Sequence, residues 1–188
     1  MNTDCKRLTL FAGHYGSGKT NIAVNYALKL RADGKPVVIH GDEEYETNLQ
    51  ENPNNAEINN SLGMCYLKLG FYDRALAKFD KAIEQDLNNP ETYLYAAVCI
   101  LAGRKPFLTP RAEIDKIEQY INAALMIEER GLFRYFQAYI KYDYFKRKFF
   151  KTSPTWEECL MQARADGLSE TDVNQLFEII KQEIPSCF

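Results

Sequence analysis

Histidine is nearly absent from this chain of 188 residues, which contains only His14 and His40. Because both lie in the first forty residues, no Ser-His-Asp or Cys-His catalytic group can be assembled from the later part of the sequence. The five cysteines include no Cys-x-x-Cys pair and have no nearby histidine, which argues against a zinc site and against a disulfide framework. A reducing cytoplasm is therefore the expected location.

Long apolar runs and a large net charge are also missing. The early apolar run at residues 8–12 is too short for a signal peptide or a membrane span, so no membrane partner is expected. The net charge of -3 gives no overall preference for nucleic acid or for anionic membranes.

One turn sequence recurs after thirty-four residues, at positions 52–55 and again at 86–89. A period of this length is typical of stacked pairs of antiparallel helices. Between the two turns, small residues stand where helices must approach closely and large ones where they interlock: Leu62, Gly63, Tyr66, Ala75, Phe79 and Ala82. At these six positions the stretch resembles a tetratricopeptide repeat. It departs from that pattern at Asn59, where the family usually has Trp, and at Leu87, where it usually has Pro.

The repeat pattern predicts the later helices as well. A first pair is expected at about 56–68 and 72–85, joined at Gly70, and a second pair begins at Pro90, a residue favoured at a first helical position. A loop-forming insertion at 103–110 then displaces the second helix of this pair. Two closing helices, the last one starting after Ser169, are expected to cap the array.

Residues 133–151 combine nine aromatic residues with six basic ones. Such a composition can stack nucleic-acid bases and bind phosphates, or it can be a helix with a buried aromatic face and solvated charges. The helical spacing of Phe136, Tyr139 and Ile140 favours packing on the preceding repeat. A nucleic-acid partner is therefore not expected.

Residues 7–40 carry a different pattern, which reads as strand, glycine-rich loop, helix and second strand. The loop at residues 13–20 matches G-x-x-x-x-G-K-[ST] without a mismatch. The segment resembles the partitioning-type (ParA/MinD-like) P-loop ATPases, with His14 where that family often has an extra lysine. The motif predicts that backbone N–H groups surround the phosphates of ATP, that Lys19 neutralises the terminal oxygens, and that the Thr20 hydroxyl binds Mg²⁺. The candidate nucleotide-binding residues are Gly13, Tyr15, Gly16, Ser17, Gly18, Lys19 and Thr20.

The P-loop pattern is incomplete. Only two strands are visible, whereas a P-loop domain needs several parallel strands covered on both faces. Asp42 is the only candidate for a carboxylate beside the metal. The leading interpretation is a remnant that does not bind nucleotide. The alternatives are a segment that binds ATP and Mg²⁺, and strands that are completed by self-association or by a partner.

The charge changes sign near residue 41, from a basic first segment to an acidic cluster at residues 42–51. This change predicts a truncated P-loop segment at 1–41, tetratricopeptide-like repeats at 42–151 and capping helices at 152–188, joined by a gene fusion or a truncation. The expected fold is mainly α: an α-solenoid of stacked helical hairpins preceded by an incomplete β–P-loop–α–β unit.

Stacked hairpins leave a concave groove that recognises a peptide or a partner segment. The family resemblance implies that the first helix of each pair lines it, at Glu57, Asn60, Met64, Leu67, Lys68, Glu91, Leu94, Val98 and Leu101. This lining has no cluster of Lys and Arg, which disfavours a clamp for acidic C-terminal carboxylates. We therefore expect an adaptor that binds a protein or peptide rather than an enzyme. The alternative is an ATP-binding, P-loop NTPase-like protein whose nucleotide state controls the repeats.

Overall fold

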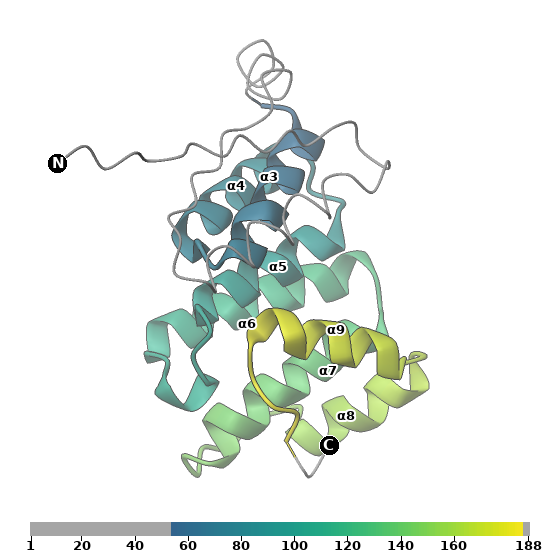
Figure 1. Cartoon of the computed structure of the whole chain (residues 1–188). Coiled ribbons are helices and arrows are strands. Elements are labelled where there is room, and N and C mark those ends of the chain that lie inside the picture. The colour runs from purple at the N-terminus through teal and green to yellow at the C-terminus, as the bar shows by residue number, and fades with distance from the viewer. Residues whose placement is uncertain (1–53, 186–188) are drawn as a thin grey trace, which may run out of the picture.

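The computed structural model describes residues 54–185, which form seven α-helices and no strand (Figure 1). The expected mainly-α class is confirmed for this part of the chain. The predicted β–P-loop–α–β unit lies outside the described residues.

The first helical hairpin joins α3 (Ala56–Leu69) to α4 (Tyr72–Gln85), close to the predicted bounds. Helix α3 begins after Asn55, whose side chain accepts a hydrogen bond from the backbone N–H of Ile58 at 3.0 Å. It ends at Gly70, whose φ of 75° lies in the left-handed region that favours glycine. These two end signals fix the length of the helix and direct the chain back along it.

The interface of this hairpin contains the residues that the repeat pattern marks. Ala75, Phe79 and Ala82 of α4 are buried. Asn59, which stands where the family usually has Trp, is also fully buried, and its amide donates to the carbonyl of Asn55 at 2.9 Å. Lys78 donates to the side-chain oxygen of Asn59 at 3.5 Å. Asn59 is therefore accommodated in the core because both ends of its amide are hydrogen-bonded.

The second hairpin joins α5 (Pro90–Leu101) to α6 (Arg111–Ile127) through a loop that contains the short 3₁₀-helix η1 (Pro106–Leu108). The predicted start at Pro90 and the predicted insertion are both confirmed. Helix α6 buries Ile117, Ile121 and Ala124, which have the same spacing in sequence as Ala75, Phe79 and Ala82 of α4.

The third hairpin joins α7 (Gly131–Ile140), which runs on into the π-helical segment η2 (Lys141–Lys146), to α8 (Trp156–Ala165). Helices α7 and α8 approach so closely that a Cβ on Gly131 would lie 2.5 Å from the carbonyl oxygen of Ala163. Helix α8 starts at a capping box formed by Thr155 and Glu158.

Helix α9 (Glu170–Ile180) begins at Ser169, as predicted, with the Ser169 hydroxyl accepting from the N–H of Asp172 at 3.3 Å. It then turns back and packs against α5 and α7 (Figure 1). The ring of Phe177 packs in a T-shaped arrangement with the rings of Tyr135 and Tyr139, at centroid distances of 6.1 and 5.0 Å. Most buried apolar residues of the three hairpins and of α9 belong to one continuous core.

Candidate functional site

The predicted nucleotide site falls outside the part of the chain that the structure describes. This applies to Gly13, to residues 15–20 and to Asp42, the candidate metal ligand. Their roles therefore remain predictions from sequence.

Four of the predicted groove residues form a stripe along α3. Glu57 is exposed, and Asn60, Met64 and Lys68 are half-buried. Their spacing of three to four residues places them on one face of the helix, over a length of ~16 Å. The stripe therefore presents an acid, an amide, a thioether and a base in that order. The side chain of Asn60 also accepts from the hydroxyl of Thr92 on α5 at 3.2 Å, which ties the stripe to the next hairpin.

The prediction is wrong for the other apolar groove residues. Leu94, Val98 and Leu101 of α5 are 2%, 1% and 0% exposed, and Leu67 of α3 is 1% exposed. These side chains belong to the core and do not line an open groove. The physical reason on α5 is that this helix packs against α3, α4, α6 and α9, so that most of its residues are buried, and the repeat pattern does not encode all of these contacts. Glu91 remains half-exposed, and it forms an ion pair with Arg130 at 2.7 Å.

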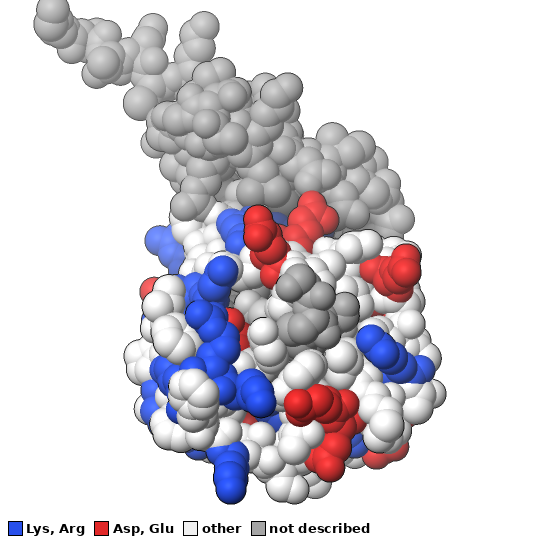
Figure 2. All heavy atoms as spheres, turned by 90° about the horizontal axis from the view of Figure 1, so that it is seen from below, with Lys and Arg blue, Asp and Glu red and all other residues white. Residues whose placement is uncertain are grey.

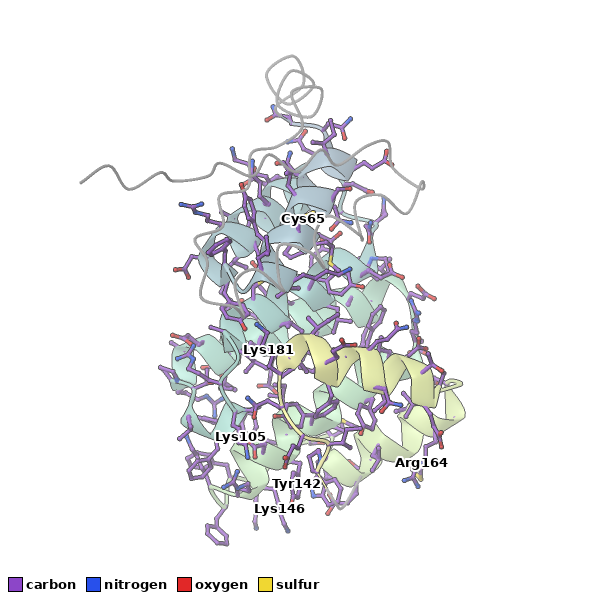
Figure 3. The ribbon with its side chains drawn as sticks, in the orientation of Figure 1. Cys65, Lys105, Tyr142, Lys146, Arg164 and Lys181 are labelled. Atoms are coloured by element: carbon purple, nitrogen blue, oxygen red, sulfur yellow. The ribbon has the colours of Figure 1, made fainter. Side chains whose placement is uncertain are left out.

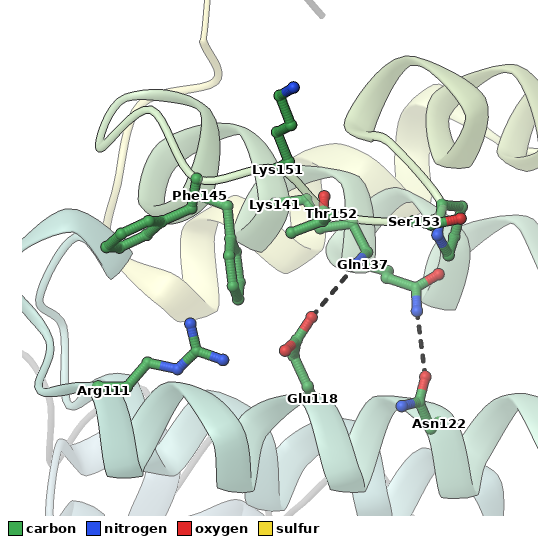
Figure 4. A pocket seen from close by; sticks show the side chains of 11 residues that line it. Arg111, Glu118, Asn122, Gln137, Lys141, Phe145, Lys151, Thr152 and Ser153 are labelled. Atoms are coloured by element: carbon green, nitrogen blue, oxygen red, sulfur yellow. Dashed lines mark hydrogen bonds and ion pairs between the residues drawn. The ribbon is translucent and has the colours of Figure 1, made fainter.

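A polar pocket of about 490 Å³ opens on a different face, between α6 and the continuous helix α7–η2 (Figure 4). Its floor and walls come from these helices, and its rim comes from the segment that leads to α8. The lining residues are Arg111, Glu118, Asn122, Gln137, Lys141, Phe145, Phe150, Lys151, Thr152, Ser153 and Pro154.

Two pairs of residues join the walls of this pocket (Figure 4). The ammonium of Lys141 donates to Glu118 Oε1 at 3.3 Å, and the amide of Gln137 donates to Asn122 Oδ1 at 3.1 Å. The pairs lie one turn apart on each helix, as antiparallel packing requires. Lys141 and Gln137 are each only 5% exposed, so the polar floor of the pocket lies deep in the fold.

Basic side chains dominate the pocket and its surroundings. Three cations and one carboxylate line it. Seen from below, Lys and Arg side chains form a band along one side of the molecule (Figure 2). Lys105 and Lys146 lie at this lower end (Figure 3).

The aromatic and basic segment divides into two parts. Phe136, Tyr139 and Ile140 are buried, which confirms the expectation that they pack in the core. At the end of η2, by contrast, Phe149 is 95% exposed and Phe150 is 52% exposed. The segment therefore supplies both core packing and an exposed tip.

The pocket was not predicted from the sequence. The sequence does contain a signal for the pocket. Glu118 and Asn122 are four residues apart on one helix, and their partners Gln137 and Lys141 are four residues apart on the other. That signal is readable only when α6 and α7 are known to be antiparallel neighbours with this register.

The thiols of the described helices are not placed for catalysis. Burial raises the pKa of Cys65, which lies on α3 (Figure 3), and burial also raises the pKa of Cys99 on α5. Burial likewise raises the pKa of Cys159, whose thiol donates to Gln137 Oε1 at 3.4 Å. A thiol with a raised pKa stays protonated at neutral pH and is a poor nucleophile.

Within residues 54–185, no group of three or more His, Cys, Asp or Glu residues is placed to hold a metal ion. No helix in the same range combines the length and the apolar content that crossing a membrane requires. No protein-family model matches the sequence, and a comparison with curated proteins finds no significant match.

Proposed function

We propose that the chain is a protein-interaction module, an adaptor built as an α-solenoid of tetratricopeptide-like hairpins with a P-loop remnant before it. The observation that carries this proposal is the packing of α3 on α4. A Cβ on Gly63 would lie 2.7 Å from the ring of Phe79, so these helices meet at the glycine and aromatic positions of the repeat pattern. Stacked hairpins of this kind bury their own core and leave a helix face for a partner.

The part of the predicted groove that is not fully buried on α3 is the α3 stripe, Glu57, Asn60, Met64 and Lys68. Its apolar residue, Met64, lies between the amide of Asn60 and the ammonium of Lys68, and the carboxylate of Glu57 lies beyond Asn60. Met adapts its shape to different apolar partners. The expected partner is therefore a peptide or helix with one apolar anchor between a basic and an acidic residue.

A site-specific crosslink tests this proposal. A photoreactive phenylalanine derivative is introduced at Met64, and at Met126 as a matched control, because Met126 is 88% exposed on α6. We expect a discrete adduct from position 64 that the Met126 variant does not form. The crosslinked peptide is then identified and synthesised, and its affinity for the unmodified chain is measured.

Exchanging the charges at the two ends of the α3 stripe tests whether the peptide binds there. The variant Glu57→Lys with Lys68→Glu should bind the peptide more weakly, and a peptide with its two flanking charges exchanged should restore the affinity. Equal adducts from both crosslinking positions, or no effect of the charge exchange, would contradict binding at the α3 stripe.

An alternative function is supported by the sequence match at residues 13–20. In this alternative the P-loop binds ATP and Mg²⁺, and the nucleotide state controls the repeats. Lys19 and Thr20 would carry the phosphate and metal contacts. Self-association through the N-terminal strands would then be one way to complete the sheet.

A further inference from the structure

The pocket between α6 and α7–η2 has more positive charge than its own ion pairs use. Lys141 donates to Glu118, and Arg111 pairs with Asp115 at 2.8 Å. An ammonium has three donors, so Lys141 has donors left beyond its bond to Glu118. Lys151, at the rim, points away from Glu118 in Figure 4 and forms no ion pair with another described residue. The pocket is therefore suited to an anionic group.

The positive charge extends beyond the pocket. Residues 141–151 include five basic residues and one acidic residue, whereas the whole chain has a net charge of -3. The positive charge of this segment is thus a local feature and not a property of the whole chain, and a band of Lys and Arg is visible on the face that Figure 2 shows. The five basic residues are spread over eleven positions of the sequence, and the same segment carries two exposed rings, Phe149 and Phe150. A chain of acidic residues with an apolar neighbour fits both features.

The aromatic rings around the pocket are poor platforms for nucleic-acid bases. The guanidinium of Arg111 lies 4.8 Å from the ring centroid of Phe145, and that of Arg147 lies 4.3 Å from the centroid of Phe107. The ammonium of Lys148 lies 3.9 Å from the centroid of Tyr144. Since base stacking requires a free ring face, these three rings, each with a cation of the chain over it, are poorly suited to it. Of the aromatic rings in this segment, Phe149 and Phe150 are exposed, and an apolar side chain of a protein ligand can contact them.

We propose that this pocket and the adjoining basic segment bind an acidic peptide segment of a partner protein. One carboxylate enters between Lys141 and Lys151, and the acidic neighbours follow the basic band. An apolar residue of the same segment contacts Phe149 and Phe150. This surface is separate from the α3 stripe, and the proposal does not depend on binding there.

The test uses the full chain and a fluorescently labelled peptide of six glutamates followed by one phenylalanine. The matching peptide with six glutamines is the control. Binding is measured by fluorescence anisotropy at about 50 mM salt and again at about 300 mM, because exposed charge pairs are screened by salt. We expect the glutamate peptide to bind at low salt, the glutamine peptide not to bind, and the affinity to fall as salt rises.

Three variants locate the binding. Lys151→Glu should weaken binding of the glutamate peptide by about three- to tenfold, and Ser153→Lys should strengthen it. Both residues are exposed on the rim of the pocket, so a change of their charge acts mainly on the rate at which the anionic peptide associates. Lys81→Glu, an exposed residue of α4, makes the same charge change as Lys151→Glu and should have little effect. Thermal unfolding of each variant checks that the fold is retained.

Several results would overturn the proposal. It fails if the glutamate peptide does not bind at low salt, or if Lys151→Glu and Lys81→Glu weaken binding equally, which indicates attraction without a site. Tighter binding of single-stranded DNA than of the peptide would replace the peptide with nucleic acid. If succinate or phosphoserine alone binds as tightly as the peptide, the pocket takes a small molecule instead.

Discussion

Gly63 of α3 and Phe79 of α4 are in direct contact, and a Cβ added to Gly63 would lie only 2.7 to 2.9 Å from three carbon atoms of the Phe79 ring. Phe79 is fully buried, and its ring stacks on that of Tyr95 with a centroid distance of 5.8 Å. The glycine is therefore required by packing, although glycine is a poor helix former. This single contact sets how closely the two helices of the first hairpin approach.

Gly63→Ala should lower the free energy of unfolding by about 1–3 kcal/mol through overpacking, even though alanine favours the helix by up to about 1 kcal/mol. Urea denaturation measures the effect. The double variant Gly63→Ala with Phe79→Leu should lose less stability than the two single variants combined, because the smaller side chain leaves space for the Cβ. If the stability loss of the double variant equals the sum of the two single losses, a clash between the added Cβ and the Phe79 ring is not the cause of the loss in Gly63→Ala.

Phe177→Ala should lower the free energy of unfolding by about 3–5 kcal/mol, because the ring of Phe177 is buried between α9 and the tyrosines of α7. The same substitution at Phe149, which is 95% exposed, should change stability by less than about 0.5 kcal/mol. If α9 covers α5 as described, Phe177→Ala should also increase binding of a hydrophobic dye. If Phe177→Ala loses the expected stability but does not bind more dye, α5 stays covered when the packing of α9 is weakened.

The pH dependence of stability should include Tyr120. Burial, strengthened by the hydrogen bond that its hydroxyl donates to Asp80 at 2.5 Å, raises the pKa of Tyr120 above its ordinary value. A raised pKa in the folded state gives stability that is complete below about pH 10, the ordinary tyrosine pKa, and that is lost as the pH rises toward the folded value. Tyr120→Phe should therefore be less stable at neutral pH, by about 1–2 kcal/mol.

The same variant should lose less stability than the unmodified chain between about pH 9 and pH 11. Urea denaturation over this range measures both slopes. The pKa of Tyr139 is also raised by burial. Tyr139 is present in both proteins, so it contributes equally to the pH dependence of their stability and does not affect the difference between the two slopes. Identical slopes for the two proteins would contradict a role for Tyr120.

Titration of the full chain with Mg-ATP should show no binding if the P-loop is a remnant. The reason is that the sequence offers two strands and a single candidate carboxylate, Asp42, where a complete nucleotide site needs more. Micromolar binding that disappears in Lys19→Ala would reject this expectation and support the nucleotide-controlled alternative. Binding that persists in Lys19→Ala would place the nucleotide elsewhere.

The helices were predictable from particular residues because their signals are local. The turn at Gly70, the start at Pro90 and the cap at Ser169 act within a few residues of sequence, and all three mark helix ends in the structure. The match of Ala75, Phe79 and Ala82 to a buried stripe follows from helical periodicity alone. Of the predicted groove residues on α3, Glu57, Asn60, Met64 and Lys68 are at least partly exposed, whereas Leu67 is buried.

By itself, the sequence determined that the described chain is helical, where most of its helices start and end, and that the first two pairs follow one pattern. The tertiary structure alone decided that α9 folds back on α5, and that α5, packed against α3, α4, α6 and α9, buries Leu94, Val98 and Leu101. It also decided that Glu118 faces Lys141 across a pocket. Periodicity shows that a helix has an apolar face, but the partner of that face depends on contacts between residues far apart in the chain.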